Sequence, residues 1–453
     1  MSSFPQPRPS AMQHLSSLRF LAFGIVFFTI VSCNSGSSET EEKTPATLSA
    51  DTDNGSILLP QGFAALLVAD SIGKARHLVV RDNGDVYVKL KDTENGGGVV
   101  ALRDTTGDGR ADVKEYFTEQ AGSGIDIYND YLYFSTDTSI YRVKLDEEAL
   151  LPSAEPELVI SGFLAQAQHA AKSFAFDNNG HIYVTVGGPS NACQEQMRTP
   201  GSPGQDPCPQ LERQGGIWQL SANKTNQTQM EDGQRYATGI RNGFALHWNK
   251  AQDQLYALQH GRDQLATLWP EYYTNEQSAE LPAEEFLRVN EGSDFGWPFC
   301  YYDPTQSKKV LAPEYGGNGQ EVGRCADKDQ PIMAFPAHWA PNDLVFYQGE
   351  SFPEKYQNGA FIAFHGSWNR APLPQQGYLV AFVPFGSDGL PSGEYERFAD
   401  QFAGSGGVIE NANDAEYRPT GLAVGPDGSL YISDDKGGRI WRVFYQGAPV
   451  AME

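Results

Sequence analysis

Arginines, two histidines, an asparagine and an aspartate stand at the edges of segments whose alternating apolar pattern predicts β-strands, and these segments lie far apart in the chain. Arginine presents a planar fork of donors to carboxylates and stays charged at neutral pH. Histidine is the natural general base near neutral pH. A fold that joined these strand edges would bind a ligand with several carboxylates beside a proton acceptor. The residues are Arg76, His169, Arg241, Asn242, Arg262, Asp263, His365, Arg370 and Arg418.

One pattern of strands that would position these residues recurs six times. Each unit has an apolar strand, a turn containing Gly, Asn or Asp, a second strand, and then a returning strand introduced by glycine or a small residue. The first halves of these units span 75–90, 124–137, 172–188, 242–261, 352–367 and 419–435. Alternation around DNG or PDG turns is a hairpin signal, and a series of such hairpins is typical of a β-propeller. We therefore predict an all-β fold, a six-bladed β-propeller over 58–448. A β-sandwich would not need six copies of one half-motif.

The same pattern predicts where the long loops lie and which strand closes the ring. Long insertions are expected between units three and four and between units four and five, the second over about 262–350. The segment 62–70 is expected to pair with the last blade and close the ring. Because the first strand of each blade lines the central channel, the polar residues at the strand edges should converge on one end of the axis.

The N-terminal residues have the pattern of an export signal. Arg19 precedes an apolar run that is of signal-peptide length and too short to span a bilayer. The run ends in Ile30-Val31-Ser32-Cys33, a pattern similar to a bacterial lipobox with Cys33 as the lipidated residue. An ordinary secretory signal is the alternative. We predict a lipoprotein signal peptide over 1–33, a polar flexible tether over 34–57, and an exported, lipid-anchored protein at the periplasmic or outer-membrane face.

The cysteine pattern and the net charge further restrict the class of protein to which this chain can belong. Apart from Cys33, two local pairs remain in loop-rich segments, which predicts the disulfides Cys193–Cys208 and Cys300–Cys325; free thiols are the alternative. The net charge is −24, so the chain lacks the basic character of a nucleic-acid-binding protein. An anionic ligand would need a local cluster of arginines to overcome that field.

One loop carries a possible structural calcium site. The segment "DTTGDGRADVKE" has oxygen-bearing side chains at the ligand positions of an EF-hand loop and Gly109 at its turn position. The alternative is an acidic surface turn, since the flanking segments read as strands. The side chains are Asp104, Thr106, Asp108, Asp112 and Glu115.

Six motifs together resemble the soluble quinoprotein glucose/sorbosone dehydrogenases, most closely the sorbosone-dehydrogenase-like branch. They are "HAAKS", "ATGIRNGFALHW", "QHGRDQL", "GSDFGWPFCYYD", "FHGSWNRAPL" and "RPTGLAVGPDGSLYISDDKGGRIWRV". The resemblance covers about 58–446. It implies a six-bladed propeller that binds pyrroloquinoline quinone (PQQ), a tricarboxylate, together with Ca²⁺.

The resemblance also implies roles. His169 matches the base that takes the proton from the anomeric hydroxyl of the sugar, and Arg241 and Asn242 match the pair beside the cofactor, with Arg241 stabilising negative charge on the quinone oxygen. The backbone carbonyls of Gly261 and Arg262 match the calcium-binding turn. The cofactor-binding arginines would be Arg418, which the resemblance supplies, and Arg76 and Arg370, which we add. The glucose-oxidising members carry a lysine in unit five, where this chain has "HGSWNR".

These inferences predict a PQQ-dependent dehydrogenase that oxidises a sugar or aldose and passes electrons to an external acceptor, a quinone or cytochrome. Two alternatives stay open. One is a metal-dependent lactonase on a six-bladed propeller, which would need carboxylate and amide ligands at the axis. The other is a non-catalytic propeller that binds carbohydrate or protein. Each residue also has a structural alternative, since a buried histidine often only satisfies hydrogen bonds and Arg241 could cap a strand.

Overall fold

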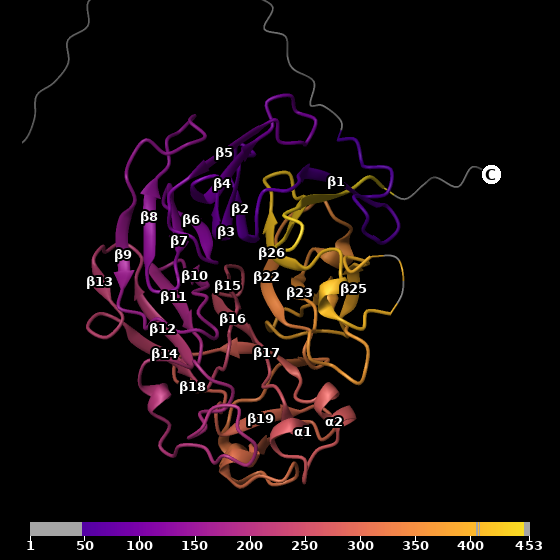
Figure 1. Ribbon diagram of the computed structural model, residues 1–453. Helices are drawn as coiled ribbons and strands as arrows, with labels where there is room; N and C mark the ends of the chain where they lie inside the picture. The colour runs from indigo at the N-terminus through magenta and orange to yellow at the C-terminus, as the bar shows by residue number, and fades with distance from the viewer. Residues whose placement is uncertain (1–47, 405, 407, 448–453) are drawn as a thin grey trace, which may run out of the picture. The chain divides into compact units, whose positions relative to one another are not determined.

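Tight turns with glycine in the left-handed region fold the chain into successive antiparallel hairpins. Gly84 and Gly428, in the DNG and PDG turns, have φ of 89° and 80°, which glycine adopts without a steric penalty. A Cβ at Gly428 would also lie 2.6 Å from Ser351 Oγ. The computed structural model describes residues 48–404, 406 and 408–447, and they form a six-bladed β-propeller (Figure 1).

Each blade has four antiparallel strands, numbered along the chain. The inner strands are β2 (Ala75–Val80), β6 (Ile125–Tyr128), β10 (Phe174–Phe176), β15 (Ala245–Asn249), β22 (Pro341–Tyr347) and β26 (Pro419–Val424). The second strands are β3 (Val86–Glu94), β7 (Tyr131–Ser135), β11 (His181–Val186), β16 (Gln254–Gln259), β23 (Gly359–His365) and β27 (Leu430–Asp434). The third strands are β4 (Gly97–Arg103), β8 (Ile140–Lys144), β12 (Gly216–Ser221), β17 (Glu284–Val289), β24 (Tyr378–Pro384) and β28 (Ile440–Tyr445). The outer strands are β5 (Val113–Phe117), β9 (Glu157–Ser161), β14 (Gln234–Thr238), β21 (Met333–Phe335), β25 (Glu396–Ala399) and β1 (Phe63–Ala69).

Smaller elements decorate the blades. β13 (Gln227–Thr228) adds to β9 and β18 (Ser293–Asp294) adds to β14, both in parallel. The remaining elements of the described chain are the hairpin β19 (Cys300–Asp303) and β20 (Lys308–Leu311), the helices α1 (Leu265–Leu268) and α2 (Asn275–Glu280), and the 3₁₀ helices η1 (Pro209–Glu212), η2 (Pro313–Tyr315), η3 (Gly323–Asp327), η4 (Glu354–Tyr356) and η5 (Ala412–Asp414).

The ring closes in the way that the sequence predicts. Inner strands of neighbouring blades contact one another all the way round, and β1 completes the last blade by pairing with β28 from Phe63–Tyr445 to Leu67–Trp441. Residues 51–57, the end of the predicted tether, pack against this closure. Leu67 N donates to Asp51 Oδ2 over 2.8 Å, and Trp441 Nε1 donates to the Gly55 carbonyl over 2.9 Å.

Blade five differs from the prediction. Its inner strand is β22, in the segment that the sequence assigned to the insertion, and β23 is its second strand. The connection from β22 to β23 is not a tight turn, because it contains η4 and the buried side chain of Phe352. The predicted unit therefore began one strand too late.

The long insertions lie within blades three and four, between consecutive strands of the same sheet. The segments 187–215 and 260–283 follow the second strands β11 and β16. A second strand ends where its inner strand begins, because the two are antiparallel. Both insertions therefore open at the end of the channel where the inner strands start, here called the cavity mouth. The opposite end is the distal mouth.

Both predicted disulfides are confirmed. Cys193–Cys208 closes part of the first insertion, and Cys300–Cys325 ties β19 to η3.

The predicted signal peptide, the lipobox with Cys33 and most of the tether lie outside the described residues. Within 48–447, apart from 405 and 407, no helix has the length and apolar character needed to cross a membrane.

Candidate active site

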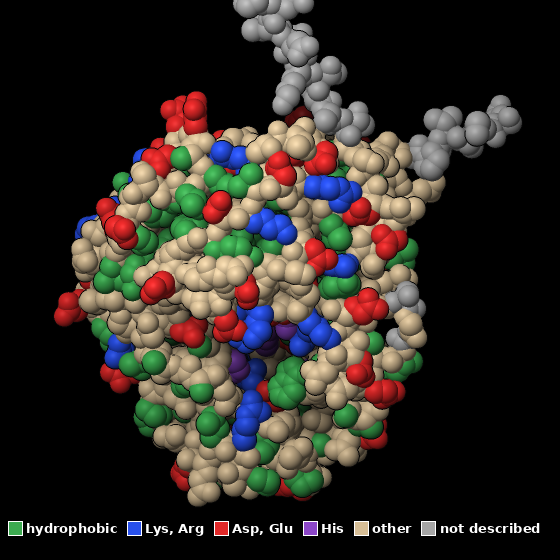
Figure 2. Space-filling model, turned by 45° about the horizontal axis from the view of Figure 1, so that its top comes forward, with side chains coloured by type: hydrophobic (Ala, Val, Ile, Leu, Met, Phe, Trp, Pro, Cys, Tyr) green, Lys and Arg blue, Asp and Glu red, His purple; other side chains and the backbone are tan. Residues whose placement is uncertain are grey.

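A two-part cavity occupies the cavity mouth. Its compartments measure about 490 Å³ and about 520 Å³, within the range of small-molecule sites. Both compartments are lined by His169, Asn242, His260, Ala340 and Trp368, so they form one continuous space. Figure 2 shows arginine, lysine and histidine side chains gathered in a hollow at the centre of this face.

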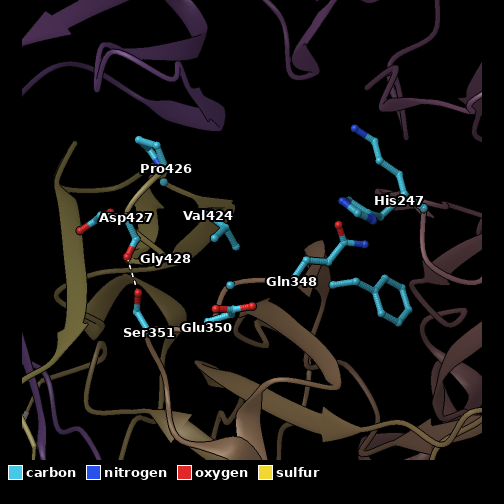
Figure 3. Close-up of a pocket in the computed structure, with 12 residues that line it drawn as sticks. His247, Gln348, Glu350, Ser351, Val424, Pro426, Asp427 and Gly428 are labelled. Atoms are coloured by element: carbon cyan, nitrogen blue, oxygen red, sulfur yellow. Dashed lines mark hydrogen bonds between the residues drawn. The ribbon is translucent and has the colours of Figure 1, made fainter.

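A second cavity of about 530 Å³ lies at the distal mouth, where β15, β22 and β26 end (Figure 3). Its ionisable lining residues are His247, Lys250, Glu350 and Asp427. Two of these are acidic and none is arginine, so this cavity does not suit an anion with several carboxylates. The cavity mouth, where arginines and histidines converge, is the better candidate for chemistry.

His169 is held as a neutral imidazole with one nitrogen facing the cavity. Its Nδ1 lies 2.6 Å from the Gly188 carbonyl oxygen, which can only accept, so Nδ1 carries the proton and Nε2 keeps its lone pair. Burial, with a further contribution from the charge of Arg241, lowers the pKa of His169 to about 3. A Cβ at Gly187 would lie 2.6 Å from the His169 Cβ, so glycine is needed for this close approach. His169 is therefore unprotonated at Nε2 across the neutral pH range.

Arg241 lies in the cavity wall and is almost fully hydrogen-bonded. Its Nη2 lies 2.8 Å from Asp263 Oδ2 and 3.1 Å from Asn191 Oδ1, and its Nε donates to the Asn191 carbonyl over 3.3 Å. Its Nη1 donates to the Gly261 carbonyl over 2.7 Å. The guanidinium is buried and held by four hydrogen bonds, which fixes a positive charge beside the cavity.

Asp263 joins several parts of this wall. Its Oδ2 also accepts from Arg198 over 3.1 Å and its Oδ1 accepts from Asn369 Nδ2 over 2.7 Å. Despite burial, the neighbouring cations, Arg241 first among them, hold the pKa of Asp263 well below its usual range. Sequence reasoning missed Arg198, because it lies in the disulfide-bonded insertion away from any strand edge.

A second cationic group lines the other compartment. Arg76 Nη1 lies 3.3 Å from Asp435 Oδ2, and His365 Nε2 lies 2.7 Å from Asp435 Oδ1. Arg418 donates through Nε to the His365 carbonyl over 2.9 Å and through Nη2 to the Gly366 carbonyl over 2.6 Å. Blades one, five and six thus bring together Arg76 and Arg418 as the sequence predicts, with Asp435 as an acid that sequence reasoning missed.

Asn242 lies between the compartments. Its side-chain Nδ2 lies 3.2 Å from His260 Nδ1, and His260 Nε2 donates to the Pro341 carbonyl over 2.9 Å. Burial lowers the pKa of His260 to about 4. Both nitrogens of His260 are therefore satisfied, and this histidine holds Asn242 in place.

Glu284 is a buried acid in the cavity wall that sequence reasoning did not single out. Its carboxyl oxygens accept from Gly261 N over 2.9 Å and from Ala340 N over 3.2 Å. Burial nevertheless raises its pKa to about 8. Glu284 is therefore protonated at neutral pH and ties blade four to the start of β22. It begins the strand "EEFLRV", whose sequence gives no sign of a cavity residue.

Arg370 and the side chain of Arg262 point away from the cavity. Arg370 Nη1 donates to the carbonyls of Ala279 and Ala337 over 3.1 and 3.2 Å. Arg262 forms a two-pronged ion pair with Glu314 of η2, with distances of 2.5 and 2.8 Å. Arg370 holds its loop against the segments that contain Ala279 and Ala337, and Arg262 joins the insertion 260–283 to η2.

The predicted calcium loop forms a turn between β4 and β5. Asp104 accepts from the backbone of Thr106, Gly107 and Gly109, while Asp112 accepts from Thr105 N over 2.8 Å. Glu115 lies on β5. The carboxylates are used in separate hydrogen bonds, and among the described residues no group of three or more His, Cys, Asp or Glu side chains is placed to hold a metal ion.

Comparison with known proteins adds to this geometry. The family model described as TrAA12-like matches residues 57–446. A PQQ-dependent pyranose dehydrogenase of Coprinopsis cinerea is 26% identical over 243 residues, which cover 47% of this chain and 31% of that protein.

Two solved structures share the fold. The PQQ domain of the Coprinopsis cinerea pyranose dehydrogenase, in its holo form, superimposes with a TM-score of 0.69 at 18% identity, over 86% of this chain and 97% of that domain. A calcium structure of a Trichoderma reesei carbohydrate-active enzyme of family AA12 has a TM-score of 0.69 at 16% identity, over 89% and 99% of the two chains. At these identities the likeness establishes the fold.

Proposed function

The chain belongs to the TrAA12-like family, and from that premise we propose that it is a PQQ-dependent dehydrogenase that oxidises a sugar. The observation that carries the proposal is the convergence of the neutral His169 and four arginines on a single cavity. His169 supplies a lone pair at Nε2, and the cationic side chains are Arg76, Arg198, Arg241 and Arg418. The fungal relative named as a PQQ-dependent pyranose dehydrogenase supports the choice of substrate class.

The residues present fit a tricarboxylate. Arg76 and Arg418 line one compartment and Arg198 and Arg241 line the other, so carboxylates can be met at both ends. Two buried polar atoms of lining residues, Arg76 Nε and Asn369 Oδ1, have no hydrogen-bond partner within the described chain. Such atoms are costly to leave unsatisfied and favour a polar ligand.

The chain's own residues would handle the proton. His169 Nε2 takes the proton of the sugar hydroxyl, while the proton on Nδ1 stays on the ring and is donated to the Gly188 carbonyl, which fixes the orientation of the imidazole. When bound, PQQ supplies the carbon that accepts hydride from the sugar. Arg241 keeps a fixed positive charge at the wall, because Asp263 and Asn191 hold its guanidinium.

Calcium is not part of the proposal. Of the two carbonyls predicted to bind it, that of Gly261 accepts from Arg241 Nη1 over 2.7 Å. A divalent cation against this oxygen would meet a guanidinium, so in this arrangement the Gly261 carbonyl does not fit the ion.

The finer parts of the function are proposals. We propose an aldose oxidised at its hemiacetal carbon, as the resemblance to glucose/sorbosone dehydrogenases implies, and an external quinone or cytochrome as acceptor. We also propose export and lipid anchoring through Cys33.

A spectral titration tests the proposal. PQQ added to the purified protein should bind stoichiometrically, and the loaded protein should reduce a dye when sugars are added. Replacing Arg76 or Arg418 by alanine should weaken PQQ binding, whereas R397A, at an exposed pair with Asp400, should not. Absence of PQQ binding by the wild-type protein contradicts the proposal, and hydrolysis of lactones without PQQ would favour the lactonase instead.

A further inference from the structure

Trp368 is an exposed aromatic residue on the rim of the cavity. It lies in the loop between β23 and β24 and lines both compartments. Its relative exposure is 60%, the second highest among the large hydrophobic residues that the structure describes as exposed. An indole this exposed gains little from folding, and its place in the lining of both compartments leaves it free to contact a ligand that enters the cavity.

The backbone on both sides of Trp368 is fixed. The buried Ser367 hydroxyl donates to Gln375 Oε1 over 2.8 Å, and Tyr378 OH donates to the Ser367 carbonyl over 2.6 Å. On the other side, Asn369 Nδ2 donates to Asp263 Oδ1 over 2.7 Å. The loop is therefore pinned to the residue that also holds Arg241, so the indole is placed relative to the reacting end of the cavity.

A second exposed apolar side chain contacts a residue that lines the cavity. Met197 has a relative exposure of 53%, and its sulfur lies 3.4 Å from Nε2 of Gln168, which lines the cavity. The interior of the cavity is cationic and polar, whereas its rim is partly apolar. This change from a polar interior to a partly apolar rim matches a ligand that has a polar reacting end and presents C–H groups over the rest of its surface.

We propose that Trp368 is a substrate-positioning residue, whose indole stacks against the C–H face of the sugar ring while the hydroxyl to be oxidised points inward to His169. This inference rests on the proposed function. Aromatic rings bury a large area at a low cost in conformational freedom, and a pinned ring adds orientation to affinity. An anionic cofactor would be bound deeper, by the arginines, and would not need this rim contact.

Steady-state kinetics of the PQQ-loaded protein tests the inference, with a dye as acceptor and glucose, galactose, xylose and maltose as probes. We expect W368A to raise KM for the best of these sugars roughly tenfold, the size of one lost aromatic contact, with kcat less affected. W368F should keep most of the affinity. The matched control is Y272A, an exposed aromatic residue outside the cavity lining. PQQ affinity, measured by spectral titration, should be the same in all four proteins.

Two outcomes overturn the inference. One is a KM of W368A within twofold of the wild-type value, and the other is a loss of PQQ affinity in W368A, which would make Trp368 a cofactor contact. A wild-type protein that binds PQQ and oxidises none of the sugars contradicts the proposed function itself, before any variant is compared.

Discussion

Arg241 and Asp263 form a buried ion pair in the wall of the cavity, with 2.8 Å between Nη2 and Oδ2. Both side chains are at most 10% exposed. A charge left alone in such surroundings is costly, because the partner that compensates its lost hydration is gone. The pair therefore couples the stability of blade four to the binding of an anion.

Asp263→Asn tests that coupling. The variant removes the charge while keeping the shape, and we expect a loss of about 3–5 kcal/mol in the free energy of unfolding, the usual effect of breaking a buried pair. Urea unfolding measures it. D130N, which breaks an exposed pair with Lys144, should change stability by less than about 1 kcal/mol. Equal effects of the two substitutions would contradict the assignment. Added PQQ should stabilise D263N more than the wild-type protein, because its carboxylates would compensate Arg241.

His169→Gln separates proton transfer from cofactor binding. Glutamine can still donate a hydrogen bond near Gly188 but has no basic nitrogen, so kcat should fall by roughly 10²–10⁴, the usual contribution of a general base. PQQ affinity should be retained. The control is H247Q at the distal mouth, which should keep its kcat. A fully active H169Q, or an inactive H247Q that is folded, would place the chemistry elsewhere.

Three partly buried histidines should make the protein lose stability in mild acid. Burial lowers the pKa of His169 to about 3, and of His247 and His260 to about 4. Between the unfolded pKa of about 6.5 and these values, the unfolded chain binds protons that the folded chain does not, so acidification favours unfolding. Unfolding midpoints in urea should therefore fall steadily from pH 7 to pH 4.5. A flat profile in this window would contradict the neutral state of these rings.

Glu284 has the opposite pH dependence. Its folded pKa of about 8 exceeds its ordinary value of 4.5, so its contribution is fully present below about pH 4.5 and is lost as pH rises through about 8. Glu284→Gln keeps a neutral side chain of the same shape and removes this titration. We expect the difference in unfolding free energy between E284Q and the wild-type protein to move in favour of E284Q between pH 5 and pH 9. A constant difference would show that Glu284 is ionised in the folded protein.

Sequence patterns predicted the architecture better than the details of the site. Hairpin turns are local signals, so six units and the closing strand were readable. The inner strand β22 was missed because no tight turn follows it, and the predicted units did not include the outer strands β5, β9, β14, β21 and β25. Arg76, His169, Arg241, Asn242 and Arg418 share one cavity because strand ends share one mouth. The direction of a side chain is set by distant partners, and so Arg370, which faces the carbonyls of Ala279 and Ala337, could not be distinguished in advance from a ligand-binding arginine.

The closure of the ring by β1 and β28 has a consequence for the order in which the protein can fold. The two strands that pair, Phe63–Ala69 and Ile440–Tyr445, stand at opposite ends of the propeller sequence. During synthesis, β1 emerges first and its hydrogen-bonding partner emerges last. Contacts between residues so distant in sequence form slowly. Until translation is complete, the nascent chain must carry an unpaired edge strand, which is a site for mispairing and for recognition by chaperones.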